Sequence, residues 1–529
     1  MANRLFVVRI ALIVALGGFL MGFDASVISG VVTFIEPQFD LTELQLGFAV
    51  ACLTLTATLA MMISGPLSDA LGRRRVLFFA AALFAVSAIL SAIAPTFWFL
   101  VVARMIGGFG VGASLIIAPM YIAEISPPEM RGQMVSFNQL NIVIGISAAF
   151  FTNYLILQLG QSEAAWAQAL MFGPYNWRWM LGLETLPAVL YFFSLFAVPE
   201  SPRWLVMKGR QEEALPVMIK AGGEEEARKE MKAVQASIAS DVEKEKVPLS
   251  DLFAPAMRLV LTIGVVVAII QQITGINSVF FYAPMIFEQS GIGTDASFAQ
   301  AILVGLINLV FTILAIALID KLGRKPLLGF GLAGITICML VLAYGFYSAT
   351  YTLSDLSGLP EAIPTAELAS IQDQTFNGDL AFKNAVKDAL GADVARRYES
   401  QLITASISMN PALVLFGILG FVASFAISIG PVMWVLFSEL FPNRVRGLAI
   451  SFVGLINSGV SFLVQQLFPW ELAHLGSAVT FLIYGVFAAI GLVFIMIVLP
   501  ETKGKSLEEL EAVLVKSRRA DNPAMGPDV

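Results

Sequence analysis

Twelve apolar stretches of helical length constrain the fold of this chain more than any other feature of its sequence. They lie near residues 7–33, 44–68, 75–94, 98–122, 134–158, 179–198, 257–287, 297–319, 326–348, 410–438, 447–468 and 476–499. About 20 predominantly apolar residues are enough for an α-helix to cross the hydrocarbon core of a bilayer. Charged residues make up only 13% of the chain, against about 25% in soluble domains. The sequence therefore predicts an all-α membrane protein with twelve transmembrane helices.

The chain has few of the residues that enzymes use for nucleophilic catalysis or metal binding. It has two cysteines, Cys52 and Cys338, both in apolar stretches, and one histidine, His474. The sequence contains no metal-ligand spacing, no P-loop, no dinucleotide-binding glycine motif and no GxSxG nucleophile elbow. We therefore expect no enzyme activity, catalytic residue, cofactor, metal or nucleic-acid partner, and no ATP-driven transport by this chain alone.

Two polar insertions interrupt the apolar stretches, and the positive charges indicate on which side each lies. Residues 200–256 are rich in Lys, Arg and Glu, whereas residues 349–408 are polar and acidic, with a helical pattern in their later half. Lys and Arg concentrate in the cytoplasmic loops of membrane proteins. With both termini inside, most of the 32 Lys and Arg residues are cytoplasmic. The residues left outside are Arg178, Lys383, Lys387, Arg396 and Arg397. We expect both termini and residues 200–256 inside, and residues 349–408 outside.

Three motifs occur twice and divide the chain into related halves. The segment SDALGRRRVL (68–77) resembles IDKLGRKPLL (319–328), EISPPEMRG (124–132) resembles ELFPNRVRG (439–447), and PESPRWL (199–205) resembles PETKGKSL (500–507). We expect six-helix halves at 1–199 and 257–499, a cytoplasmic helical linker at 200–256, an insertion at about 349–408 and a cytoplasmic tail at 500–529. Parallel halves with a substrate site at the midplane between them are one known plan for transporters.

Taken as a set, several motifs resemble the sugar porter family of the major facilitator superfamily. They are GPLSDALGRRR, PESPRWL, QQITGINSVFFYAP, DKLGRKPL, GPVMWVLFSELFPNRVRG and PETKGKSLEEL. The likeness covers nearly the whole chain except residues 349–408. It is greatest to bacterial xylose–proton symporters and smaller to facilitative glucose transporters. The resemblance implies the major facilitator fold, in a multi-pass protein of the cytoplasmic (inner) membrane. It also implies a monomer in contact with membrane lipid that moves a monosaccharide by alternating access.

Asp24 lies in the first apolar stretch, where an isolated carboxylate costs several kcal/mol. It is either a structural carboxylate that pairs with a neighbour or a proton site. A proton site needs a carboxylate whose protonation responds to its surroundings and to a nearby cation. Arg104, in VVARMIGGFGVG, is taken as the only other strong charge well inside a membrane segment of this half. The resemblance implies that Asp24 and Arg104 match the proton-coupling pair of the proton-coupled relatives; facilitative relatives generally carry an uncharged residue at the Asp position.

Three amides, Gln271, Gln272 and Asn277, occur in the apolar segment IIQQITGIN. A buried amide is costly unless it forms hydrogen bonds. Interhelical hydrogen bonds of about 0.6 kcal/mol each are one explanation. The other is recognition of sugar hydroxyls, because an amide, like a hydroxyl, both donates and accepts. Gly275 allows local unwinding between these amides.

The resemblance places further residues at the substrate site. They are Gln139, Asn308, Trp434 and Asn457, with Phe281, Phe425 and Gly430 as weaker candidates. An aromatic face suits the C–H side of a sugar ring, although packing or an interfacial position also explains Trp434. Asn457 replaces a Gln of the bacterial xylose relatives, and Ser458 replaces a Trp. Met21 and Phe281 stand where the xylose relatives have Phe and Tyr. The substrate therefore stays open between a hexose such as glucose and a pentose such as xylose.

Charged residues recur at the expected cytoplasmic helix ends of both halves. The expected gating network contains Asp69, Arg73, Glu124 with Arg131, Glu200, Arg203, Asp320 with Arg324, Glu439 with Arg446, and Glu501. Isolated surface ion pairs contribute only about 0–1 kcal/mol. Because the set is repeated, we favour a network that holds the halves together inside when the site faces outward.

These observations predict proton-coupled symport of a monosaccharide, with proton and sugar as partners. One alternative is a facilitative uniporter in which Asp24 is only structural. A less favoured one is a sugar receptor, since the tail from Glu501 to Val529 is short. The insertion at 349–408 could be a lid, a partner site or a solvated addition, and we favour the last.

Overall fold

The computed structural model describes residues 4–243, 248–357, 359–360, 362–442 and 444–503. Within them, twelve helical segments are long and apolar enough to cross a membrane, as the sequence predicted. The spans are α1 (Arg4–Phe39), α2 (Glu43–Leu71), α3 (Arg73–Ala92), α4 (Phe97–Ile125), α5 (Pro128–Gly160), α7 with α8 and η1 (Asn176–Gly182, Thr185–Ser194, Leu195–Ala197), α13 with α14 (Arg258–Ile273, Ile276–Glu288), α15 (Thr294–Leu322), α16 (Arg324–Tyr347), α20 with α21 (Pro411–Ile427, Ile429–Leu440), α22 (Arg446–His474) and α23 (Gly476–Val498).

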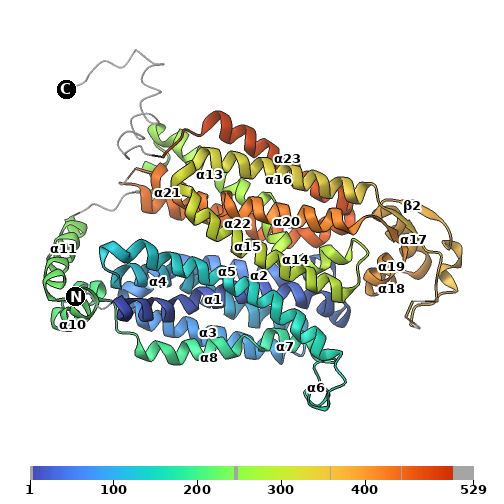
Figure 1. Ribbon diagram of the computed structural model, residues 1–529, viewed down its shortest axis with the longest axis horizontal. Helices are drawn as coiled ribbons and strands as arrows, with labels where there is room; N and C mark the ends of the chain where they lie inside the picture. Colours follow the sequence, from blue (N-terminus) through green and yellow to red (C-terminus); the bar gives the residue numbers. More distant parts are fainter. Residues whose placement is uncertain (1–3, 244–247, 358, 361, 443, 504–529) are drawn as a thin grey trace, which may run out of the picture.

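The spans form two bundles that lie side by side (Figure 1). Within the first, α1 packs on α5, and α4 packs on both α2 and α3; within the second, α16 packs on α23 and α20. The bundles meet where α2 contacts α22, α5 contacts α15 and α1 contacts α14. Large apolar side chains such as Phe330, Phe416 and Ile497 are at least 70% exposed, as expected where a surface faces lipid rather than water.

Three spans are broken, and the breaks carry polar residues into the bundles. One lies at Leu183 and Glu184 between α7 and α8, one at Thr274 and Gly275 between α13 and α14, and one at Ser428 between α20 and α21. Gly275 has a φ of +90°, and a Cβ atom there would lie 2.4 Å from the ring of Tyr484. Glycine is required at such a position, so the unwinding expected at Gly275 is confirmed.

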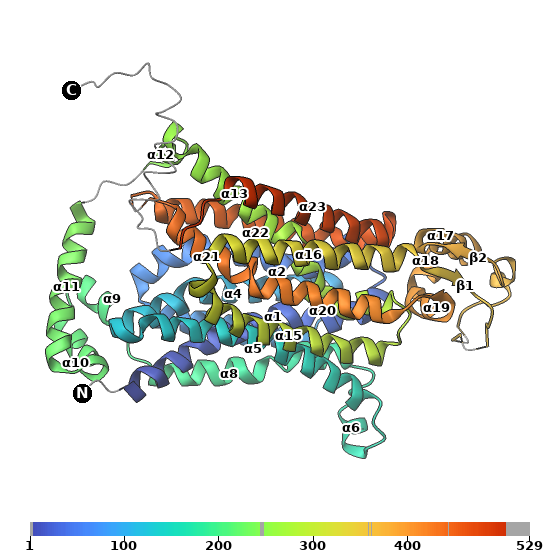
Figure 2. The ribbon, with the colours of Figure 1, turned by 45° about the horizontal axis from the view of Figure 1, so that its top comes forward.

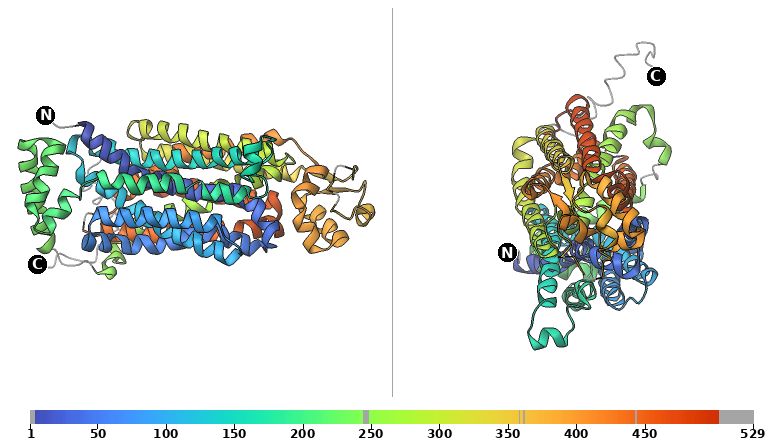
Figure 3. Two further views of the ribbon diagram at one scale, coloured as in Figure 1. Left: turned by 90° about the horizontal axis from the view of Figure 1, so that it is seen from below. Right: turned by 90° about the vertical axis from the view of Figure 1, so that its right-hand side faces the viewer.

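The two ends of the molecule carry different additions, shown at opposite ends of Figure 2 and in the left panel of Figure 3. The linker end is defined by residues 200–256, which form α9 (Pro202–Met207), α10 (Gln211–Gly222), α11 (Glu224–Glu243), α12 (Leu249–Leu252) and η2 (Pro255–Met257). Trp204, Leu205 and Met218 give α9–α11 a small apolar core of their own. The insertion end is defined by residues 349–408, and the short α6 (Ala165–Ala169) lies near it.

The insertion at 349–408 is folded around its own core. It contains β1 (Thr350–Thr352), η3 (Glu367–Ser370), β2 (Thr375–Asn377), α17 (Asp379–Leu390), α18 (Ala392–Arg397), α19 (Glu399–Ser406) and β3 (Ile407–Ser408). The strands form an antiparallel sheet in the order β2-β1-β3. Tyr351 is buried with Phe382 and Leu402, while Thr350 and Thr352 point the other way. The helices match the expected pattern, but the sheet departs from an all-α fold, because strands of two or three residues are too short to show a period.

Candidate functional site

Asp24 and Arg104 face each other inside the first bundle. Asp24 on α1 is 2% exposed and Arg104 on α4 is 1% exposed. Asp24 Oδ1 lies 3.5 Å from Arg104 Nη1, and Arg104 Nε donates to the carbonyl of Ala49 on α2 at 3.1 Å. Among the described residues, Asp24 Oδ2 and Arg104 Nη1 have no hydrogen-bond partner. The predicted pair is therefore present as a loose, buried contact whose atoms are not saturated by other groups.

A glycine of α4 makes room for the Asp24 carboxylate. A Cβ atom at Gly107 would lie 2.7 Å from Asp24 Oδ2 and 2.5 Å from the hydroxyl of Ser87. Such distances are shorter than packed atoms tolerate, so any larger residue would displace the carboxylate. Gly107 therefore allows α4 to lie close to the Asp24 carboxylate.

Glu184 is a third buried ionisable residue that the sequence argument missed. It is 2% exposed at the break between α7 and α8, and it interacts electrostatically with both Asp24 and Arg104. Its Oε1 atom has no hydrogen-bond partner among the described residues. The statement that Arg104 is the only other strong charge inside a membrane segment of this half was therefore wrong. The sequence does indicate this residue, because Glu184 lies within the apolar stretch 179–198.

Four of the predicted amides form one hydrogen-bonded cluster in the second bundle. Gln272 Nε2 donates to Gln271 Oε1 and to Asn457 Oδ1, each at 3.1 Å. Asn457 Nδ2 donates to Gln271 Oε1 at 2.6 Å, and Asn277 Nδ2 donates to Gln272 Oε1 at 2.7 Å. Gln271 Nε2 also reaches the carbonyl of Gly430 at 3.4 Å. The break at Gly275 lets α13, α14 and α22 contribute to the same cluster.

Of the other predicted substrate residues, Gly430 contacts this cluster through its carbonyl, whereas the described contacts of the rest lie elsewhere. Gln139 on α5 is exposed, and Trp434 on α21 is 48% exposed, with its ring edge-on to Phe437 at 6.0 Å. Asn308, Phe281 and Phe425 are buried. A Cβ atom at Gly430 would lie 2.9 Å from the Phe425 ring, so Gly430 permits that close packing.

A polar stripe on α22 continues the amide cluster toward the first bundle. Asn277 Nδ2 donates to the hydroxyl of Ser461 at 2.6 Å, and Gln465 Nε2 donates to the same hydroxyl at 2.8 Å. Thr54 on α2 then donates to Gln465 Oε1 at 2.9 Å. Sequence reasoning missed Ser461 and Gln465. The sequence indicates both residues through their four-residue spacing from Asn457, which places all three on one face of a helix.

The charges at the linker end form the same arrangement twice. Arg73 contacts Glu124 through Nε and Nη2, each at 3.0 Å, and Asp69 through Nη1 at 2.7 Å. Arg324 contacts Glu439 at 3.2 and 2.7 Å.

A second carboxylate caps the loop beside each arginine. Glu200 accepts the backbone N–H of Arg74, and Glu501 accepts those of Arg324 and Lys325, all at 3.0 Å.

The pairing within this set differs from the grouping made along the sequence. Glu124 pairs with Arg73 rather than with Arg131, whose described ion pair is with Glu230 of α11 at 3.5 Å. Glu439 likewise pairs with Arg324, whereas Arg446 Nε donates to the carbonyl of Phe441. Arg203 reaches Ser237 at 3.5 Å, and the Asp320 side chain lies outside the described part of the structure. Residues close in sequence were grouped, but the helix ends bring together partners more than 50 residues apart.

Among the described residues, the hydrogen bonds between the bundles lie away from this charged end. Besides Thr54 with Gln465, Ser147 donates to the carbonyl of Gly305 at 2.9 Å, Gln466 to that of Leu44 at 2.7 Å, and Gln161 to Asp295 at 2.7 Å. The described ion pairs of the charged set, by contrast, each stay within one bundle or join it to the linker. The bundles are therefore closed toward the insertion end in this conformation.

Comparison with known proteins agrees with this geometry. The model of the family described as "Sugar (and other) transporter" matches residues 10–358 and 394–514. This chain belongs to the sugar (and other) transporter family. An arabinose–proton symporter of Bacillus subtilis (strain 168) is 34% identical over 97% of this chain and 96% of its own. A D-xylose–proton symporter of Escherichia coli (strain K12) is 34% identical over the same shares.

Solved structures of the Escherichia coli xylose transporter XylE share the fold of this sugar porter. Its partially occluded inward-open form is 32% identical, covers 95% of this chain and 100% of its own, and has a TM-score of 0.71. Another form is bound to 6-bromo-6-deoxy-D-glucose and has a TM-score of 0.66. It is 33% identical and covers 97% of this chain and 100% of its own. The resemblance seen in the sequence motifs is confirmed. The family match omits residues 359–393, which lie in the insertion.

Proposed function

We propose that this sugar porter moves a monosaccharide into the cell together with a proton, with Asp24 as the proton site. The observation that carries the proposal is the Asp24–Arg104 pair, which is buried, 3.5 Å long and incompletely hydrogen-bonded. A purely structural ion pair in a low-dielectric interior needs close geometry and full hydrogen bonding to offset its desolvation. The loose contact instead suits a carboxylate that alternates between binding a proton and pairing with Arg104.

The orientation follows from the positive charges. The linker end carries Arg73, Arg74, Arg131, Arg324 and Lys503 at the helix ends and faces the cytoplasm, because Lys and Arg are retained on that side. The insertion end faces outward, and the protein spans the inner membrane as a monomer. The conformation described is therefore closed outside, which agrees with its likeness to an inward-open form of XylE.

Transport proceeds by rocking of two rigid halves, residues 1–199 and 257–499, around the central site. In the outward-facing state Asp24 binds a proton and the site binds sugar. After the halves rock, the proton leaves to the cytoplasm, and Arg104 then pairs with the ionised carboxylate. Glu184 adds a second carboxyl group to this pocket, where it interacts with Asp24 and Arg104, and it helps set when the proton is released. No covalent chemistry is required, so the protein acts as a transporter and not as an enzyme.

The amide cluster binds the sugar, and Gln139, Asn308 and Trp434 complete the substrate site. In this conformation the four amides form hydrogen bonds with one another. A sugar hydroxyl can replace an amide in each bond because it both donates and accepts. Relatives are named for arabinose, xylose and glucose, which supports a pentose or hexose. Asn457 and Phe281 differ from the residues expected at these positions in the xylose relatives, so the preferred sugar is found by experiment.

The paired clusters at the linker end are the inner gate. Arg73 with Glu124, and Arg324 with Glu439, hold the helix ends within each half. When the halves close inside, these clusters meet and stabilise the outward-facing state.

The decisive experiment measures external pH in a lightly buffered, de-energised suspension of cells that express the protein. Glucose, xylose and arabinose are added one at a time. Alkalinisation with one sugar, absent in Asp24→Asn, establishes symport and identifies the substrate. Equilibration of labelled sugar without any pH change would make the protein a facilitator and would leave Asp24 with a structural role only.

A further inference from the structure

The insertion at 349–408 is fixed firmly to the second half. Asp379, the first residue of α17, is 6% exposed, and it accepts the backbone N–H of Ser477 at the start of α23 at 2.7 Å. A carboxylate in this position also interacts favourably with the positive end of the helix dipole. Gln289 at the end of α14 donates to Glu399 at 3.2 Å, and Ser400 donates to Glu288 at 3.3 Å. The insertion therefore moves with the second half.

Arg396 of the insertion reaches across to the first half. It lies on α18, and its Nη1 donates to the carbonyl of Leu41 at 3.2 Å. Its Nη2 lies 3.5 Å from Asp40 Oδ1 and 3.3 Å from Asp393 Oδ1. Asp40 and Leu41 form the short turn between α1 and α2. One side chain of the insertion thus contacts both a carboxylate and a backbone carbonyl of the opposite half.

Charged residues of both signs meet at this point. Glu36, Asp40 and Glu43 lie where α1 ends and α2 begins. Glu399 of the insertion and Glu43 repel Glu36, while Arg396 and Lys383 of the insertion attract it. Burial alone would lower the pKa of Lys383, but Glu399 and Asp379 raise it above its ordinary value, so Lys383 is charged at neutral pH.

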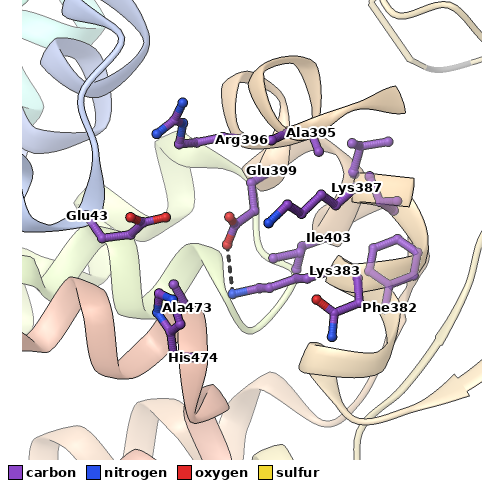
Figure 4. A pocket seen from close by; sticks show the side chains of 14 residues that line it. Glu43, Phe382, Lys383, Lys387, Ala395, Arg396, Glu399, Ile403, Ala473 and His474 are labelled. Atoms are coloured by element: carbon purple, nitrogen blue, oxygen red, sulfur yellow. Dashed lines mark ion pairs between the residues drawn. The ribbon is translucent and has the colours of Figure 1, made fainter. Parts of the chain in front are cut away.

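A cavity of about 310 Å³ lies in this junction (Figure 4). Glu43 of α2 lines it on one side, His474 of α22 on another, and Lys383, Lys387 and Arg396 of the insertion on a third. The dashed pair in Figure 4 joins Lys383 to Glu399 at 2.7 Å. The cavity therefore has walls from both halves and from the insertion, which shows that the three parts meet in this closed arrangement.

We propose that residues 349–408 form an outer clasp, which is carried by the second half and holds the first half through Arg396 when the transporter is closed outside. The proposal rests on the rocking of two halves given above. Opening outside separates the α1–α2 turn from α22 and from the insertion, so the contacts of Arg396 with Asp40 and Leu41 must break. The clasp therefore favours the inward-facing state and sets how readily the transporter opens outward.

The test measures outward opening directly. Cys52 and Cys338 are replaced by Ala, and Ser147→Cys places a single thiol at the contact with Gly305 that is sealed in this conformation. A membrane-impermeant maleimide added to intact cells reaches this thiol only when the outside opens. Exposed ion pairs are weak, so Arg396→Ala is expected to speed labelling by about two- to fivefold.

Arg397→Ala is the matched control, because Arg397 is the adjacent arginine and its side chain is exposed. It is expected to label at the parent rate. The charge exchange Arg396→Asp with Asp40→Arg is expected to restore slow labelling. Equal rates for Arg396→Ala and Arg397→Ala would overturn the clasp.

A second measurement needs no substitution in the clasp. Raising external salt screens ion pairs at a surface, so labelling of the parent is expected to accelerate, and a rate independent of salt would contradict the proposal. Neither readout requires sugar or proton movement, so a failed clasp leaves symport intact. A parent protein that is never labelled from outside would instead contradict the alternating access on which both proposals rest.

Discussion

The hydroxyl of Thr54 donates a hydrogen bond of 2.9 Å to Oε1 of Gln465 across the boundary between the two halves. Through Gln465 and Ser461 this bond is continuous with Asn277 and Gln272 of the amide cluster. On the other side, Thr54 belongs to α2, the helix whose Ala49 carbonyl holds Arg104. The amide cluster of one half and the charged pair of the other are thus joined through one helix and a chain of side-chain hydrogen bonds.

Thr54→Val is expected to weaken this link, because valine keeps the shape and loses the donor. Loss of one hydrogen bond costs about 1 kcal/mol, so the closed-outside state should lose about fivefold in relative population. The measurement is labelling of Ser147→Cys from outside, which should become faster. Thr54→Ser keeps the hydroxyl and should label as the parent does; equal labelling of both variants would remove Thr54 from the link.

Asp24→Asn is expected to abolish uphill accumulation of sugar and to leave exchange of sugar across the membrane. The amide fills the same space but cannot take up or release a proton, so the cycle loses its driving ion and keeps its conformational change. Uptake against a gradient and counterflow of labelled sugar are measured in the same cells. Continued accumulation by the variant would contradict a coupling role for Asp24.

Glu184→Gln tests the third buried ionisable residue of this pocket. Glu184 interacts with both Asp24 and Arg104, so its removal should alter the dependence of uptake on external pH while counterflow persists. Glu471→Gln is the matched control, since Glu471 lies in the other half and accepts a bond from Tyr484 that an amide oxygen also accepts. If both variants keep the pH profile of the parent, Glu184 has no part in coupling.

Gln272→Ala is expected to weaken sugar binding at least tenfold. The substitution removes one proposed sugar contact and leaves the amide of Asn277 without one of its acceptors. Each unpaired buried polar group costs about 1–3 kcal/mol. Binding is measured by titration of the purified protein with the sugar that causes alkalinisation. Gln133→Ala, at an exposed position of α5, serves as the control; unchanged affinity in Gln272→Ala would make the amides structural.

Local patterns in the sequence predicted the elements well and their contacts less well. The twelve spans follow from apolar length, and the break at Gly275 follows from a glycine beside clustered amides. The pairing of Glu124 with Arg73 could not be read in this way, because it depends on how α3 and α4 meet. The stripe of Asn457, Ser461 and Gln465 was visible in the sequence, but only its first member was used.

The contacts of the insertion could be predicted from the sequence even less. Its later helices were expected, yet its sheet rests on strands of two or three residues. Its contact with the first half depends on Arg396 meeting Asp40, which lies more than 350 residues away. Composition described it as a polar addition, and only the packing of α17, α18 and α19 against both halves shows what it touches.

Arg73→Ala is expected to destabilise the first half more than any exposed substitution at the same helix end. Arg73 is 5% exposed and bridges Asp69 and Glu124, so its removal leaves the carboxylate of Glu124 without a cation. Loss of one partner of a buried pair costs about 3–5 kcal/mol, and Arg73→Lys should recover only part of this because it cannot contact Glu124 through two nitrogens. Thermal unfolding of the purified protein in detergent measures the effect, with Arg75→Ala, at an exposed neighbouring position, as control. Equal melting temperatures for Arg73→Ala and Arg75→Ala would show that the cluster adds nothing to the stability of this half.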